Sequence, residues 1–84
     1  MVGLGDMYDQ GEGVTQDFTE ALKWYREAAE KNNGYAMYNI GVMYKYGKGV
    51  PKNRIEATKW YRSASENGYE DAKIKLIKSG IIKN

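Results

Sequence analysis

Two short glycine-rich stretches are the parts of this chain that most resemble a ligand-binding motif. "YKYGKGVPKN" places Lys48 between Gly47 and Gly49. Glycine-rich loops that carry a lysine can bind phosphate through their backbone N–H groups. A nucleotide-binding P-loop, however, has Ser or Thr directly after its lysine and lies between a strand and a helix. Here Val50 follows the glycines, and in the matching earlier stretch, "YDQGEGVTQD", the lysine is replaced by Glu12.

These observations favour a structural role for both stretches, as turns between helices. Glycine readily adopts left-handed backbone conformations that other residues avoid, and Gly11 and Gly13 match the glycines of the second stretch. We expect Val14 and Val50 to pack each turn onto the core.

A pair of carboxylates, Asp6 and Asp9, is the other candidate for acid–base chemistry. We interpret both as solvated surface charge, because nothing around them in the sequence would shift their pKa values. The chain has no histidine and no cysteine. It therefore lacks the usual general base, the commonest metal ligand and any thiol nucleophile. We predict neither enzymatic activity nor a bound cofactor or metal.

Composition limits the possible classes of protein. With 84 residues, 42% hydrophobic and 29% charged, the chain suits one small globular domain. A net charge of +2, dispersed among acids, argues against nucleic-acid binding. No apolar run approaches the roughly 20 residues of a membrane span, so we expect no membrane association. The first residues do not resemble a signal peptide, which slightly favours a cytoplasmic location.

An internal repeat organises the chain. Displacing the sequence by 36 residues places Gly5 on Gly41 and superimposes two "KWYR" segments. A fixed period between about 20 and 50 residues indicates stacked structural repeats. Apolar residues recur with helical spacing inside each repeat. The pattern predicts helices over residues 2–10, 17–31, 35–46, 53–66 and 70–79.

Local signals support these helices. Asp17 with Glu20, and Asn53 with Glu56, resemble capping boxes at helix starts. Asn67-Gly68 is a typical helix end, and Asn32 takes the matching place in the first repeat.

Gly5 and Gly41 lie among the apolar residues of two predicted helices, where glycine lowers helix stability by about 1 kcal/mol relative to alanine. We therefore expect a neighbouring helix to approach closely there. The Trp24-Tyr25 and Trp60-Tyr61 pairs could be base-stacking platforms, but their place in the stripes favours packing between helices.

The last segment, "EDAKIKLIKSGIIKN", could be a basic amphipathic membrane helix. We favour a closing helix of the repeat array, with Ala72 and Leu76 directed inward. In that case Ile77, Ile81 and Ile82 would be left without a covering helix.

The repeat resembles the Sel-one-like repeat (SLR), a relative of the tetratricopeptide repeat. The resemblance covers almost the whole chain, with Asn32 and Ile77 replacing glycines of the pattern. It implies an all-α fold of antiparallel helix-loop-helix units forming a short right-handed α-solenoid. We expect one domain, 1–84, with a half-unit 1–10 leading into units of about 1–36 and 37–72 and a closing helix 70–84. The matching residues are Leu4, Gly5, Tyr8, Gly11, Gly13, Val14, Ala21, Trp24, Tyr25 and Ala28, then Ala36, Ile40, Gly41, Tyr44, Gly47, Gly49, Val50, Ala57, Trp60, Tyr61, Ala64 and Gly68.

By the same resemblance, the chain is expected to be a non-catalytic module that binds a protein or peptide on its concave face. Solenoids line that face with the first helix of each pair, and aromatic residues are enriched at interfaces. The alternatives are a structural segment of a longer array and a module that self-associates through its uncovered ends. The groove residues carried over by analogy are Asp6, Asp9, Gln10, Tyr35, Tyr38, Val42, Lys45, Tyr46, Asp71, Ile74 and Lys78, with most contact energy assigned to Tyr35, Tyr38 and Tyr46.

Overall fold

The computed structural model describes residues 2–11, 13 and 15–80. These residues form helices and turns, with no strand among them, and the predicted all-α solenoid is confirmed. Each helix begins and ends within one residue of its predicted bounds. The helices are α1 (Val2–Gln10), α2 (Phe18–Glu30), α3 (Gly34–Tyr46), α4 (Arg54–Glu66) and α5 (Glu70–Lys78).

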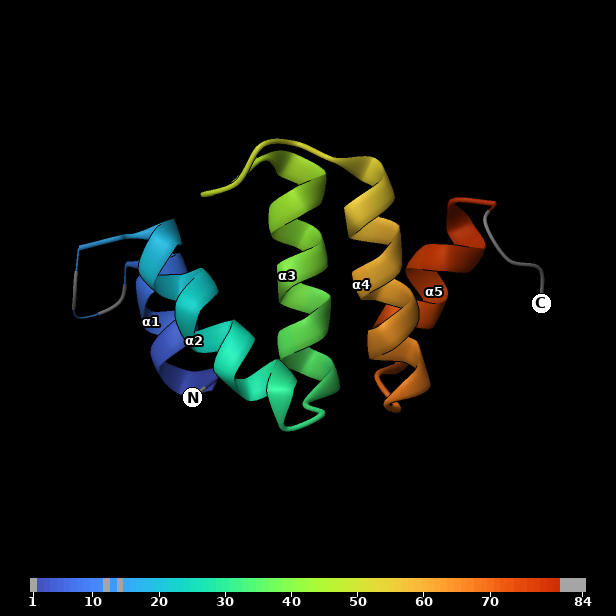
Figure 1. The fold of residues 1–84 in the computed structure, drawn as a ribbon, viewed down its shortest axis with the longest axis horizontal. Coiled ribbons are helices and arrows are strands. Elements are labelled where there is room, and N and C mark those ends of the chain that lie inside the picture. The colour runs from blue at the N-terminus through green and yellow to red at the C-terminus, as the bar shows by residue number, and fades with distance from the viewer. Residues whose placement is uncertain (1, 12, 14, 81–84) are drawn as a thin grey trace.

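The helices stack in sequence order, each packing on its neighbours along the chain (Figure 1). Helices α1 and α2 form the first antiparallel pair, α3 and α4 form the second, and α5 follows α4. The molecule is elongated along the stack, with extents of 40 × 24 × 18 Å. Helices α1 and α5 therefore lie at opposite ends, and α3 is covered on both sides.

Each long second helix starts with a capping residue that is also tied to the preceding helix. The Asp17 carboxylate accepts from the backbone N–H groups of Thr19 and Glu20, at 3.0 and 3.1 Å. Its own N–H donates to the carbonyl of Tyr8 at 2.8 Å, and the Asn53 N–H donates to that of Tyr44 at 2.9 Å. The capping-box interpretation is thus right for the side-chain acceptor and wrong for the return bond, because the N-cap N–H already has a partner in the helix before it.

The two helical glycines are contact points between paired helices, as expected. A Cβ on Gly5 would lie 2.6 Å from Cε1 of Tyr25, and one on Gly41 would lie 2.8 Å from Cδ1 of Tyr61. The ring against each glycine is therefore tyrosine, with Tyr25 fully buried. The neighbouring indoles of Trp24 and Trp60 are only half-buried.

Both glycine-rich stretches are turns, as predicted. Gly47 and Gly49 have φ angles of +72° and +74°, and Gly11 and Gly13 have +73° and +75°. The second turn reaches back over the start of α2 (Figure 1), where Nζ of Lys48 lies 5.6 Å from the centre of the Phe18 ring. Lys48 thus packs on the protein itself. Val50 packs against the core as expected, whereas Val14 lies outside the described residues.

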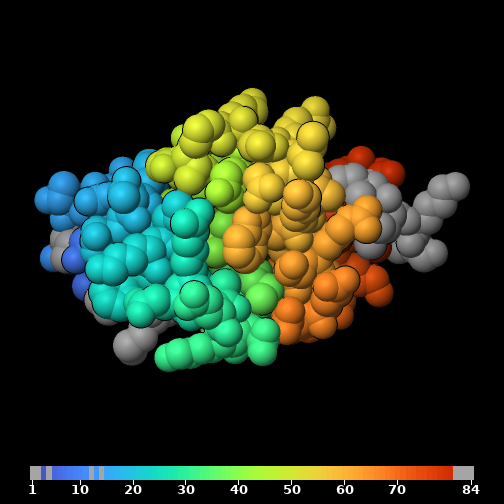
Figure 2. Space-filling view, viewed as in Figure 1, coloured from blue at the N-terminus to red at the C-terminus, as the bar shows by residue number. Residues whose placement is uncertain are grey.

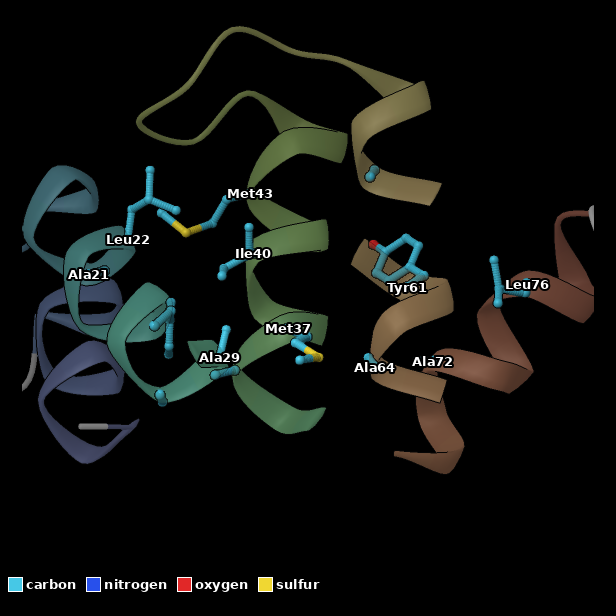
Figure 3. Packing of buried hydrophobic residues seen from close by; sticks show 14 residues of the cluster. Ala21, Leu22, Ala29, Met37, Ile40, Met43, Tyr61, Ala64, Ala72 and Leu76 are labelled. Carbon is cyan, nitrogen blue, oxygen red and sulfur yellow. The ribbon is translucent and has the colours of Figure 1, made fainter. Parts of the chain in front are cut away.

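One continuous apolar core links α2, α3, α4 and α5 (Figure 3). Ala72 and Leu76 of α5 are 0% and 2% exposed, which confirms that this helix belongs to the stack. No helix among the described residues is long and apolar enough to span a bilayer. Ile77 is half-buried, while Ile81 and Ile82 lie outside the described residues.

Candidate protein-interaction site

The predicted groove residues all lie on α1, α3 and α5, the first helices of their pairs. They differ in how accessible they are. Six are half-buried and five are exposed. The half-buried residues are Asp6, Asp9, Tyr35, Tyr38, Val42 and Lys45; the exposed ones are Gln10, Tyr46, Asp71, Ile74 and Lys78.

A tyrosine cluster joins α3 to the elements that follow it. The ring of Tyr69, just before α5, lies 5.7 Å from Tyr35 in an edge-to-face arrangement and 5.1 Å from Tyr38. Tyr38 also lies 5.4 Å from Tyr61 of α4. Such pairs contribute about 0.5–1.5 kcal/mol beyond the burial of their area. Tyr35 and Tyr38 therefore hold the helices together as well as lining the predicted groove.

The carboxylates of Asp6 and Asp9, on α1, accept hydrogen bonds from tyrosine hydroxyls of α2 and α3. Oδ1 of Asp6 accepts from the hydroxyls of Tyr25 at 2.6 Å and Tyr35 at 2.9 Å. Oδ2 of Asp9 lies 3.2 Å from the Tyr25 hydroxyl, and its Oδ1 is buried with no partner among the described residues. The interpretation of both as solvated surface charge is wrong, because hydroxyls from α2 and α3 converge on them.

These surroundings keep the tyrosines protonated. Burial, followed by the hydrogen bond to Asp6, raises the pKa of Tyr25 far above its usual value of 10.0. Burial also raises the pKa values of Tyr38 and Tyr69, and in both cases the Asp71 carboxylate adds to the effect. The cluster therefore presents neutral rings and hydroxyls between negative charges on α1 and α5.

Two large apolar residues on this face are exposed: Tyr46 at the end of α3 and Ile74 in the middle of α5. Tyr46 is 58% exposed and Ile74 is 45% exposed. Nζ of Lys45 lies 5.3 Å from the centre of the Tyr46 ring. This part of the face can contact another molecule without first breaking the tyrosine cluster.

Comparison with known proteins supplies the family. The Sel1 repeat model matches residues 1–33 and 34–69. The chain belongs to the Sel1 repeat family. Proteins of this family are helical-repeat modules for protein–protein interaction, and the family is generally non-catalytic.

Two solved Sel1-type structures show the same fold at high identity. A Sel1 repeat protein from Oxalobacter formigenes superimposes with a TM-score of 0.83 at 40% identity, over 90% of this chain. The protein c5321, a protective antigen of uropathogenic Escherichia coli with an SLR fold, superimposes with a TM-score of 0.88 at 40% identity, over 93% of this chain. This chain covers only 32% and 17% of those two proteins. No curated protein sequence matches it.

Tyr69 was missed by the sequence analysis, although it joins the cluster. It occupies the N-cap of α5 and makes no side-chain capping bond. The equivalent residue in the preceding Sel1 repeat, Asn33, does cap its helix, accepting from the Ala36 N–H at 2.9 Å. An aromatic residue in place of a capping residue was the available signal, because tyrosine cannot fill the capping role.

The α2 and α4 side of the Sel1 stack carries a separate groove, with α3 at its base (Figure 2). Its volume is about 400 Å³. The half-buried Trp60 lines it, whereas Nε1 of Trp24 is buried with no partner among the described residues. Trp60 also packs against the core, as expected for an indole between helices, and both indoles are half-buried. The groove is lined by Arg26, Ala29, Glu30, Tyr44, Glu56 and Trp60.

No three metal-binding side chains converge in the part of the chain that the structure describes.

Proposed function

We propose that the face formed by α1, α3 and α5 binds an extended segment of a partner protein. The observation that carries this proposal is the exposure of Tyr46 and Ile74 on α3 and α5, the two helices that the tyrosine cluster joins. Aromatic residues are enriched in the buried centres of protein interfaces. The cluster supplies a rigid support, so little side-chain entropy would be lost on binding.

The side chains divide this surface into two kinds of contact. Tyr46 and Ile74 would bury their exposed area against the partner, whereas Tyr38 would contribute mainly by holding the surface in place. Truncation of an anchor residue at an interface costs about 2 kcal/mol or more. For Tyr38 we expect a loss of affinity of about 1–2 kcal/mol, part of it through weaker packing of α5.

The test is capture of interacting proteins by the intact chain and by Tyr46→Ala, followed by a measured dissociation constant for each captured protein. Ile55→Ala on α4 is the matched control, because Ile55 is 72% exposed and lies on a second helix of a pair. We expect Tyr46→Ala to weaken binding at least tenfold and Ile55→Ala to leave it unchanged. If the intact chain and both variants bound the captured protein with equal affinity, the groove would be excluded as the binding site.

A second candidate is a structural segment of a larger array. The two solved relatives are several times longer than this chain, which favours this alternative. Repeat arrays generally need about three units for stability, so we expect either self-association through the ends or a low melting temperature. Sedimentation over a concentration series tests this, and a monomer of high melting temperature at all concentrations would argue against it.

A further inference from the structure

A small pocket lies where the ends of α3, α4 and α5 meet. Its volume is about 90 Å³, well above the roughly 10–15 Å³ needed for one water molecule. Lys45 comes from the last turn of α3, Arg54 from the first turn of α4, and Ser79 from the end of α5. The pocket is lined by Lys45, Arg54, Ala57, Thr58, Tyr61 and Ser79.

Three residues that line the pocket differ in kind from their counterparts in the first repeat. The residues 36 positions earlier than Arg54, Thr58 and Ser79 are Phe18, Leu22 and Met43. Leu22 and Met43 are buried in the core, and Phe18 packs against it. Arginine, threonine and serine thus replace three large apolar residues, so this part of the pocket is lined by hydrogen-bonding groups.

The charge at this place is also reversed. Lys45 corresponds to Asp9, the carboxylate that faces Tyr25 in the first repeat. Neither Lys45 nor Arg54 forms an ion pair with a carboxylate among the described residues. Two like charges beside one cavity repel each other, and an anion between them would relieve that repulsion. The start of α4 adds partial positive charge, whereas the lysines in the last turns of α3 and α5 offset the negative ends of those helices.

Tyr61 adds an unused polar group. It is 6% exposed, lines the pocket, and has its hydroxyl directed toward α3 (Figure 3). That hydroxyl is buried with no partner among the described residues. Burial raises the pKa of Tyr61 to about 12, so it remains a hydrogen-bond donor at neutral pH. The Thr58 hydroxyl already donates to the Arg54 carbonyl at 2.9 Å, which leaves the Tyr61 hydroxyl and the charged groups of Lys45 and Arg54 as donors.

We propose that this pocket binds a phosphate group between Lys45 and Arg54. A tetrahedral oxyanion suits two cationic donors that approach from different helices, because charge-assisted hydrogen bonds to its several oxygens can form at once. The phosphate can come from inorganic phosphate or from a phosphorylated side chain of a protein. The site goes beyond the proposed groove, since only Lys45 belongs to both.

The experiment is a titration of the ¹⁵N-labelled chain with sodium phosphate at ionic strength held constant with sodium chloride. We expect saturable changes in the amide signals of Thr58 and Ser79. Lys45→Gln and Arg54→Gln should each weaken binding about tenfold or more, the loss expected for one charged hydrogen-bond partner. Lys73→Gln removes the same charge from an exposed position on α5 outside the pocket and should leave the affinity unchanged.

Filling the pocket with a larger apolar side chain tests the proposal without changing the charge of the protein. Thr58→Leu introduces the residue found at the equivalent position, Leu22, and should abolish phosphate binding while the melting temperature is kept or raised. Changes that never saturate, or an equal loss of affinity in Lys73→Gln, would overturn the proposal.

The source of the phosphate is distinguished by a second titration, with a short uncharged peptide that contains one phosphoserine. Tighter binding of this peptide than of inorganic phosphate assigns the site to a phosphorylated partner, and the reverse order assigns it to free phosphate. Ile74→Ala changes a residue of the proposed groove that does not line the pocket, and should retain phosphate affinity, so failure of the groove proposal and failure of this one are separable.

Discussion

The two repeats share a backbone but differ around their central tyrosines. Tyr25 donates to Asp6 and approaches Asp9, so that its hydroxyl is held by the facing helix. Tyr61 sits against the equivalent glycine, yet its hydroxyl has no partner among the described residues. The ring and the glycine therefore set the geometry of each helix pair, while the groups around the hydroxyl are free to differ. That freedom is what allows the second repeat to carry a polar pocket.

The strongest test of the geometry that both repeats share is to add a side chain to Gly5 and Gly41, the two glycines that contact the tyrosine rings. Gly5→Ala and Gly41→Ala would each place a methyl group within 2.6–2.8 Å of a buried tyrosine ring. We expect a loss of about 3 kcal/mol in unfolding free energy, near the upper end for overpacking. Gly3→Ala is the matched control in α1, because nothing lies within 4 Å of its added Cβ. It should raise stability by about 0.5–1 kcal/mol through helix propensity alone. Urea unfolding measures the change in unfolding free energy for all three variants. Similar changes for Gly3→Ala and Gly5→Ala would refute the close contact between Gly5 and the Tyr25 ring.

The difference between the repeats predicts opposite results for one chemical change. Tyr25→Phe removes a donor from two half-buried carboxylates and should cost about 2 kcal/mol, as for hydrogen bonds to charged groups. Tyr61→Phe removes an unpartnered hydroxyl and should change stability by less than about 0.5 kcal/mol in phosphate-free buffer. Denaturant midpoints of the two variants check this. Equal losses would mean that the two hydroxyls have equivalent surroundings.

High pH should weaken the fold through these tyrosines. The pKa values of Tyr25 and Tyr61 are raised in the folded state. Their contribution to the free energy of unfolding is therefore complete below about pH 10, and it is lost as the pH rises towards the folded-state pKa. For Tyr61 the loss falls between pH 10 and about pH 12. Unfolding free energies across this range should fall less steeply in Tyr61→Phe than in the unmodified chain. An identical slope would contradict the raised pKa.

The helix caps should give the smallest difference. Asp17 accepts from two N–H groups, whereas Asn53 accepts from one. Alanine at an N-cap costs about 1 kcal/mol, and we expect Asp17→Ala to cost slightly more than Asn53→Ala. Thermal unfolding resolves the two, and the reverse order would show that the number of accepted bonds is not decisive.

Much of the fold could be predicted because its determinants are local. The 36-residue period, the capping residues and the paired glycines of each turn lie within short stretches of sequence. They predicted each helix to within one residue and the conformation of both turns. The predicted groove residues lie on α1, α3 and α5, and Tyr69 was missed because its contacts come from α3, more than 30 residues earlier.

By itself the sequence determined the helices, their order and the close approach at Gly5 and Gly41, since spacing and residue type suffice for these. Only the tertiary structure decided which ring of each Trp-Tyr pair meets the glycine. Adjacent helical residues point about 100° apart, and the rotation of one helix against its neighbour selects between them. The same holds for Asp6 and Asp9, whose surroundings come from α2 and α3. It holds also for the pocket of Lys45 and Arg54, which three helix ends form together.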